Sequence, residues 1–318
     1  MDFILLDILT IVGLSLFEIV SSIDNAVINA DVLATVSKKA RRWFLTWGIF
    51  SAVFLMRGAL PLLIVYSLNP SLSLQETAAR AFSSDPAIIA AVEESAPPLL
   101  MAGGVFLVFL FFHWIFLEPK HYGLIGEAYI HKKGVWFYAV VSIMLTLLIW
   151  FSIQADPLVA FGASVGSSIF FITHGFRQNA EQRERELLGN RNMSDVSKIL
   201  YLEVIDASFS IDGVVGAFAF TFSILFILIG NGIGAIAVRN ITIRNIENVK
   251  KYKYLKNGAM YSIAFLGTVM VANSFRIKLP EWISPIATIV VMAYFFQKSR
   301  SELKKYKEPS SDASSKSH

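Results

Sequence analysis

Nine long apolar stretches constrain the fold of this chain more than any other feature. A helix of about 20 predominantly apolar residues is needed to cross the hydrocarbon core of a bilayer. The chain is 55% hydrophobic and only 16% charged, which is typical of a protein that crosses a membrane many times. The sequence therefore predicts an all-α fold, a polytopic transmembrane helical bundle. The nine predicted spans are residues 3–33, 43–66, 97–117, 134–153, 157–175, 198–220, 223–243, 258–277 and 282–297.

Basic residues are unevenly divided between the segments that join these spans. If the N-terminus lies outside the cell, the inward-facing segments hold 24 of the 28 Lys and Arg residues. Positively charged loops are retained on the cytoplasmic side of a membrane. We therefore expect a multi-pass protein of the cell (inner or plasma) membrane, with the N-terminus outside and the C-terminus cytoplasmic. We also expect one transmembrane domain over residues 1–298 and a disordered tail over 299–318.

Two acidic patches interrupt the apolar stretches, and they look like copies of one another. In an alignment of the two, Glu18 falls on Asp206 and Asp24 falls on Asp212. In the expected orientation, the first span enters from outside and the sixth enters from inside. The patches then run antiparallel, as inverted-topology repeats require. The predicted repeat halves cover about residues 1–118 and 198–278, with linker spans at 134–176 between them.

The spacing of these acidic residues predicts irregular backbone. On an unbroken helix, Glu203 and Asp212 would point to opposite sides, so a straight helix cannot direct all of the acidic residues at one small ion. Ser, Asp, Asn and Gly residues near 21–25 and 209–213 weaken helical hydrogen bonding or allow irregular φ and ψ. We therefore expect the first and sixth helices to be broken there, around a cavity near the middle of the membrane.

The two breaks would gather carboxylates around one cavity. Their mutual repulsion would be relieved by a divalent cation or by partial protonation. Oxygen ligands suit Mg²⁺, Ca²⁺ or Mn²⁺, and competition between protons and metal would give a route to cation/proton exchange. Asn25 is either a neutral oxygen ligand or a cap at the helix break. The predicted metal ligands are Glu18, Asp24, Asn25, Glu203, Asp206 and Asp212.

Other polar residues within the spans are candidates for the lining of the cavity. Arg57 either balances the charge of the cavity or extends towards an interface. Asn231 either lines the cavity or forms hydrogen bonds between helices. We expect Arg239 at the membrane interface, and the small residues of 162–166 at a close contact between helices. The predicted cavity-lining residues are Arg57, Asn231, Ser22 and Ser210.

The composition also excludes several classes of function. The chain has no cysteine, which excludes disulfides, thiolate metal sites and iron–sulfur clusters. His113 and His174 lie on apolar spans without a spaced partner for a zinc site, so they are interpreted as packing residues. We expect no catalytic residues, no resident cofactor and no nucleic-acid partner. The expected partners are the lipid bilayer and a divalent metal ion, and the oligomeric state is left open.

The chain resembles the TerC family of integral membrane proteins, in particular a branch labelled only as a domain of unknown function. The resemblance rests on the segments 18–25 and 203–212, with weaker matches at Arg57 and at 230–239. Family members are similar to manganese exporters, so the resemblance implies Mn²⁺ efflux with the five carboxylates as ligands. The chain departs from many relatives at Gly213, where they carry Ser or Asn.

Three functions remain open at this point. The leading hypothesis is a secondary transporter that exports a divalent cation, with Mn²⁺ implied by the resemblance. The second is an exporter of an amino acid or other organic cation, which the number of carboxylates disfavours. The third is a membrane stress-response scaffold or an intramembrane enzyme. An enzyme would need a nucleophile or a metal triad, and the histidines of the spans do not pair for one.

Overall fold

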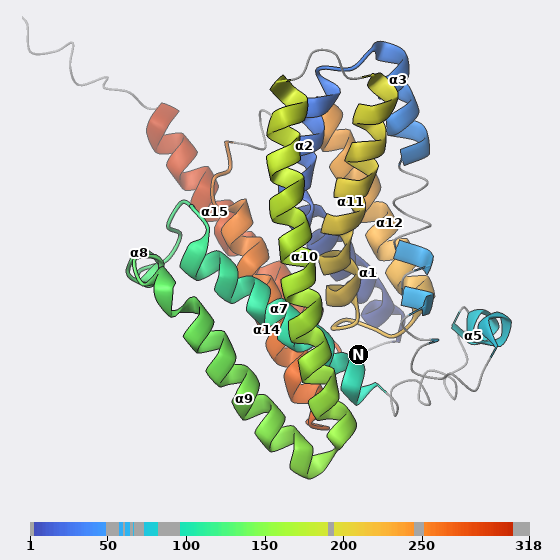
Figure 1. Ribbon diagram of the computed structural model, residues 1–318, viewed down its shortest axis with the longest axis vertical. Coiled ribbons are helices and arrows are strands. Elements are labelled where there is room, and N and C mark those ends of the chain that lie inside the picture. The colour runs from blue at the N-terminus through green and yellow to red at the C-terminus, as the bar shows by residue number, and fades with distance from the viewer. Residues whose placement is uncertain are drawn as a thin grey trace, which may run out of the picture.

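Long helices make up the computed structural model (Figure 1). It describes residues 3–48, 57–59, 61–63, 66, 73–81, 96–189, 194–244 and 251–307. These residues contain no strand, which confirms the all-α prediction. The α-helices are α1 (Phe3–Ser21), α2 (Ile23–Leu33), α3 (Lys38–Trp43), α5 (Leu74–Ala81), α7 (Pro97–Leu117), α8 (Glu127–His131), α9 (Phe137–Ala155), α10 (Pro157–Gly189), α11 (Asp195–Ala217), α12 (Ile224–Arg244), α14 (Leu255–Ser274) and α15 (Ile283–Lys307).

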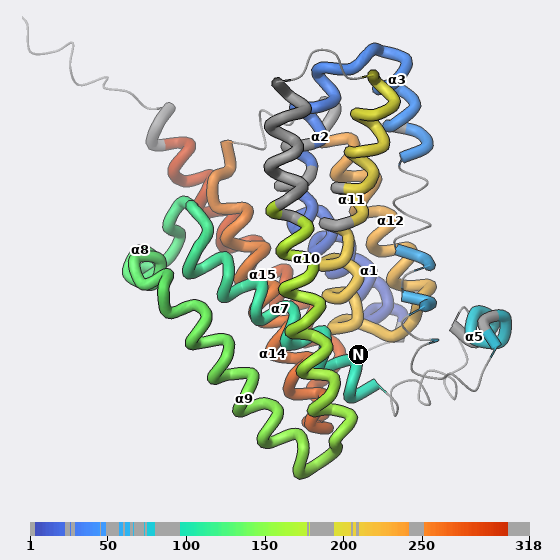
Figure 2. The backbone as a smooth tube through the Cα atoms, in the orientation of Figure 1, coloured from blue at the N-terminus to red at the C-terminus, as the bar shows by residue number. Residues whose placement is uncertain are grey.

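Five of these helices are long and apolar enough to cross a membrane. They contain the candidate spans Ile4–Ser21, Pro97–Leu117, Gly134–Ala155, Pro157–Phe176 and Ile224–Ile241. Helix α9 forms an antiparallel hairpin with the first half of α10 (Figure 2), and it leaves six large apolar side chains exposed, those of Tyr138, Ile143, Leu147, Trp150, Phe151 and Ile153. In water such a surface would be unfavourable, whereas lipid covers it at no penalty. The protein is therefore membrane-embedded.

The other predicted spans have different outcomes. Residues 198–220, 258–277 and 282–297 fall largely in helices α11, α14 and α15. Nearly half of the predicted span 43–66 lies outside the described residues. The total of nine spans and the inverted repeat therefore remain predictions.

Helix α7 packs along both α10 and α14. It begins at Pro97, since proline suits the first turn, where a backbone N–H has no intrahelical acceptor. A Cβ at Gly166 of α10 would overlap the carbonyl oxygen of Ala102 in α7 and would lie 2.8 Å from its carbonyl carbon. The two backbones are this close because position 166 has no side chain. The close helix contact predicted at 162–166 is confirmed.

One of the two predicted helix breaks is present. Helix α1 ends at Ser21 and α2 begins at Ile23, which confirms the break expected near 21–25. Helix α11 runs without interruption through residues 209–213, so the predicted break in the sixth helix is wrong. The Ser210 hydroxyl donates to the Asp206 carbonyl one turn back (2.7 Å), a contact that occurs within continuous helices.

The predicted disordered tail begins later than expected. Helix α15 continues to Lys307, so the prediction of disorder is wrong for residues 299–307, and residues 308–318 lie outside the described part of the chain. Side chains within this stretch are anchored to the segment before α14. The Ser299 hydroxyl accepts a hydrogen bond from the Tyr254 backbone N–H (3.0 Å), and Glu302 accepts one from the Tyr254 hydroxyl (2.6 Å).

The helices that carry the two acidic patches lie close together. Helix α1 packs along α12 and also contacts α11. In Figure 1, α1 runs towards α2 and α3, whereas α11 starts beside the end of α10 and runs in the opposite direction. The acidic patches of α1 and α11 are thus carried by neighbouring, antiparallel helices.

A buried carboxylate holds the segment between α7 and α9 in place. Both oxygens of Glu127 accept hydrogen bonds from backbone N–H groups, those of Gly123 (2.7 Å) and Leu124 (3.0 Å). The Tyr261 hydroxyl (2.9 Å) and the Asn257 amide (3.2 Å) of α14 donate to the same carboxylate. This network fixes the α7–α9 connection against α14.

Glu118, just after α7, forms a second contact with α14. Its carboxylate pairs with Lys256 Nζ (2.7 Å) and lies 3.4 Å from His113 Nδ1. Burial alone would raise the pKa of Glu118, but its contacts with His113 and with the Lys256 ammonium outweigh this effect. The pKa is therefore held below its usual range.

Candidate functional site

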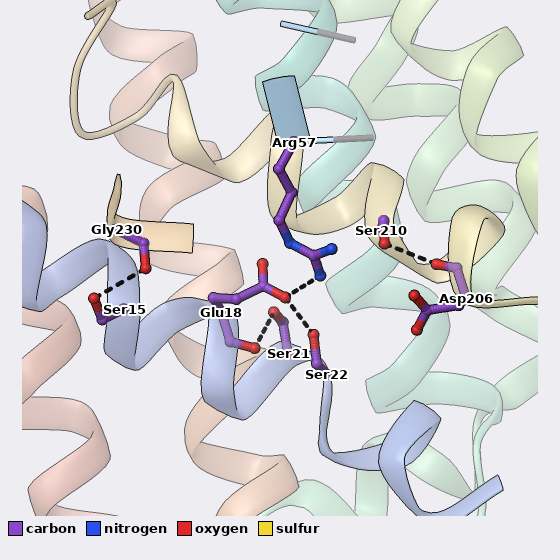
Figure 3. A network of polar contacts seen from close by, with 8 residues as sticks. All are labelled: Ser15, Glu18, Ser21, Ser22, Arg57, Asp206, Ser210 and Gly230. Atoms are coloured by element: carbon purple, nitrogen blue, oxygen red, sulfur yellow. Dashed lines mark hydrogen bonds and ion pairs between the residues drawn. The ribbon is translucent and has the colours of Figure 1, made fainter. Parts of the chain in front are cut away.

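The candidate site is built around Glu18, in the last turn of α1. Its side chain is 1% exposed and forms an ion pair with Arg57, which is itself buried. Glu18 Oε1 accepts hydrogen bonds from the Arg57 guanidinium and from the Ser22 hydroxyl, the latter at 2.7 Å (Figure 3). Glu18 Oε2 is buried and accepts no hydrogen bond from any described residue. One oxygen of this carboxylate is thus well satisfied and the other is not.

The helix break directly after Glu18 is small. Ser22 has φ −92° and ψ 1°, between the α and β regions, and it interrupts the helix for one residue. The Ser22 N–H still donates to the Glu18 carbonyl (3.1 Å), and the Ala26 N–H donates to the Ser22 carbonyl (2.9 Å). The backbone is therefore bent rather than unwound. The Ser22 side chain, freed from capping, binds the Glu18 carboxylate.

Two glycines let neighbouring helices approach Glu18. A Cβ at Gly213 of α11 would lie 2.7 Å from Glu18 Oε2, and one at Gly234 of α12 would lie 2.6 Å from Glu18 Cβ. Both distances are shorter than a van der Waals contact. The Glu18 side chain therefore occupies space that only glycine at these two positions leaves open. Gly213 was expected to favour a helix break, but its role in the structure is close packing.

Charges of alternating sign continue from Glu18 towards α12. Arg57 interacts electrostatically with both Glu18 and Asp206. Arg239 interacts in turn with both Asp206 and Glu203. The described residues thus form a network of three carboxylates and two guanidinium groups, in the order Glu18, Arg57, Asp206, Arg239, Glu203.

Arg239 is buried beside the other members of this network. Its side chain is 9% exposed, and its guanidinium lies over the Phe44 ring at 4.2 Å from the centroid. Whether Arg239, two residues before the end of its candidate span, also lies at the depth of the membrane interface stays a prediction. The sequence did carry a signal for the burial of Arg239, because Arg239 lies within the apolar candidate span that ends at Ile241.

The unbroken helix α11 changes how its acidic residues can act. Asp212 is 7% exposed and follows Glu203 by nine residues. On a straight helix these two side chains point to opposite sides and are separated by about 13.5 Å along the axis. One small ion therefore cannot contact both of these side chains at the same time while α11 is straight.

The remaining predicted site residues are placed as follows. Asn231 is fully buried, and its amide forms no hydrogen bond within the described part of the chain. Ser210 is also buried, on α11. The side chains of Asp24 and Asn25 lie outside the described residues. Among the side chains that are described, no three His, Asp or Glu residues are arranged to hold a metal ion, so the metal-ligand assignment stays a prediction.

Apolar helices that enclose a network of carboxylates and arginines define the class: a helical membrane protein with charged groups inside its bundle. The chain belongs to the family described as "Protein of unknown function (DUF475)", whose model matches residues 23–305. The match begins directly after Ser22 and covers every predicted site residue except Glu18 and Ser22. In comparisons with the curated proteins and with the solved structures, nothing matches the chain.

Proposed function

We propose that the protein is a secondary transporter that exports a divalent cation, with Mn²⁺ as its cargo. The observation that carries this proposal is the buried Glu18 carboxylate, whose Oε2 accepts no hydrogen bond from the described residues. An anionic oxygen buried in this way is unfavourable unless a cation or a proton satisfies it. The choice of Mn²⁺ comes from the resemblance to the TerC family.

The charge balance around Glu18 supports a cationic cargo. The network contains three carboxylates and two guanidinium groups. Asp212 adds a further buried acidic residue on α11, the helix that carries Glu203 and Asp206. An excess of carboxylates attracts cations and repels anions. Carboxylate oxygens are also the ligands that Mn²⁺ and Mg²⁺ prefer.

The cation contacts the carboxylates in succession rather than all at once, because Glu203 and Asp212 lie on opposite sides of α11. Protons compete for the same carboxylates, which supplies a route to cation/proton exchange. The antiparallel arrangement of α1 and α11 supports an inverted repeat, a design in which substrate sites lie between the repeats. The N-terminus faces outwards in this proposal, so export is directed towards that side.

The test is transport by the purified protein in liposomes. External Mn²⁺ would be supplied, and its entry would be followed with a trapped metal-sensitive dye, with and without a pH gradient. Asp24→Asn and Asp212→Asn should each abolish transport, since each removes one negative charge from the path. Asp7→Asn is the matched control, because Asp7 lies on α1 but is exposed, away from the network.

The same variants separate the alternatives in cells. Cells that produce the wild-type protein or Asp7→Asn should tolerate added Mn²⁺ and contain less of it. Cells with Asp24→Asn or Asp212→Asn should not, although the variants still reach the membrane fraction. Normal Mn²⁺ tolerance with both variants would contradict the proposal and favour a scaffold, which does not need the carboxylates.

A further inference from the structure

Arg57 is positioned between two acidic residues from different helices. Its guanidinium pairs with Glu18 of α1 and interacts electrostatically with Asp206 of α11. In Figure 3 the Arg57 side chain extends to Glu18, and the Asp206 carboxylate lies on the opposite side of the guanidinium. Arg57 is 4% exposed, so water does not screen these contacts.

Glu18 cannot satisfy a second cation without affecting this contact. Its Oε1 is already engaged by Arg57 and Ser22, and its buried Oε2, which the described residues leave without a hydrogen bond, faces Gly213. A divalent cation that binds the carboxylate through Oε2 would come to within a few ångströms of the guanidinium. Repulsion between two cations that close, inside a bundle shielded from water, is strong.

We propose that Arg57 is a displaceable internal cation, with which the cargo competes for the Glu18 carboxylate. When a divalent cation binds, the guanidinium moves away from Glu18 and keeps its interaction with Asp206. When the cation leaves, Arg57 pairs with Glu18 again, so that the buried carboxylate is not left uncompensated. Arg57 thereby weakens cargo binding enough for release. This inference rests on the proposed function and adds the element that sets its affinity.

The other arginine of the network is less suited to this role. Arg239 is held by its stacking on Phe44 as well as by Asp206 and Glu203. Arg57 lies in a π-helical turn at 57–59, a geometry that is frequent at functional sites. When Arg57 is displaced from Glu18, Asp206 remains as its second acidic partner.

The experiment measures Mn²⁺ affinity and transport for the full-length protein in lipid nanodiscs and in liposomes. Free Mn²⁺ is quantified from its paramagnetic resonance signal, which gives the Kd directly. Arg57→Gln should bind Mn²⁺ at least tenfold more tightly than the wild type and should transport it at least tenfold more slowly, since release is impaired. Arg57→Lys keeps the positive charge but not the planar fork of the guanidinium. Its Mn²⁺ affinity should therefore lie between those of the wild type and Arg57→Gln.

Glu18→Gln combined with Arg57→Gln is the matched control. This double variant removes the pair together and should bind Mn²⁺ more weakly than the wild type, because the carboxylate is gone. Thermal unfolding with and without Mn²⁺ checks that each variant is folded. It should also show a larger Mn²⁺-induced rise in Tm for Arg57→Gln than for the wild type, because the metal then compensates Glu18 alone.

The outcomes are distinguishable. Wild-type transport together with an Arg57→Gln affinity equal to or weaker than wild type would overturn the role of Arg57 and leave the proposed function intact. If neither protein binds or transports Mn²⁺, Mg²⁺ or Ca²⁺, the proposed function is overturned and the role of Arg57 with it. Tighter Mn²⁺ binding by Arg57→Gln and intermediate binding by Arg57→Lys would support both the proposed function and the role of Arg57.

Discussion

Replacing Gly166 by alanine tests whether the contact between α7 and α10 depends on the absence of a side chain. The added Cβ would overlap the backbone carbonyl oxygen of Ala102 and would lie 2.9 Å from its Cα. A backbone atom within a helix cannot rotate away, so the two helices would have to separate. Gly175, further along α10, has no atom within 4 Å of the position of its Cβ and provides a matched control on the same helix.

The two substitutions should have opposite effects on stability. Alanine is favoured over glycine in a helix by up to about 1 kcal/mol. Overpacking a well-packed contact destabilises a protein by about 1–3 kcal/mol, and the upper end applies where backbone is struck. Gly166→Ala should therefore destabilise the protein by about 2 kcal/mol, whereas Gly175→Ala should stabilise it by up to about 1 kcal/mol. The expected gap is about 3 kcal/mol.

Unfolding in mixed micelles with increasing SDS measures this gap. The six tryptophans of the chain supply the fluorescence signal, and the free energy of unfolding is compared between the two variants and the wild type. The slope of the free energy against SDS must be unchanged for the comparison to hold. If Gly166→Ala is as stable as Gly175→Ala, the close contact between α7 and α10 does not exist as described.

Three further predictions concern single side chains. Gly213→Ala places a methyl group 2.7 Å from Glu18 Oε2, so Mn²⁺ transport into liposomes should fall at least tenfold; unchanged transport would contradict the placement of Glu18. Tyr261→Phe removes a hydrogen bond to Glu127 and should lower the free energy of unfolding by about 1.5–3 kcal/mol, measured by SDS titration. The folded-state pKa of Glu118 is depressed, so its contribution to stability is present above its ordinary pKa of 4.5 and is lost as the pH falls. The difference in Tm between the wild type and Glu118→Gln should thus shrink on acidification below pH 4.5, and a constant difference would refute the ion pair.

Much of the helical framework could be predicted because lipid imposes a length and a composition on every span. The apolar stretches at 97–117 and 134–153 correspond closely to α7 and α9, and the serines at 21–22 predicted the end of α1 correctly. The end of α15 could not be predicted in this way. Polar residues after 298 were interpreted as disordered, but Ser299 and Glu302 bind the segment before α14, a contact that local composition does not reveal.

The carboxylates of the candidate site could be selected from the sequence, but their arrangement in space could not be predicted. Ionisable residues inside apolar segments are rare, so Glu18 and Asp206 could be selected from the sequence alone. Whether a helix breaks is decided by its packing, and in α11 the contact of Gly213 with Glu18 is compatible with a continuous helix. The position of the Arg239 guanidinium depends on stacking against Phe44, which is nearly 200 residues away in the chain, so local sequence does not reveal it.

A comparison of two buried glutamates in this chain supports the proposal that Glu18 binds a cation rather than only supporting the fold. Glu127 is 1% exposed, and both of its oxygens accept hydrogen bonds from backbone and side-chain donors. Glu18 is equally buried, but only its Oε1 has donors among the described residues. A carboxylate that only supports the fold gains nothing from an unsatisfied oxygen, since well-packed apolar residues would be at least as stable. The difference between the two carboxylates is therefore explained if Glu18 Oε2 is kept for a cation that binds and leaves.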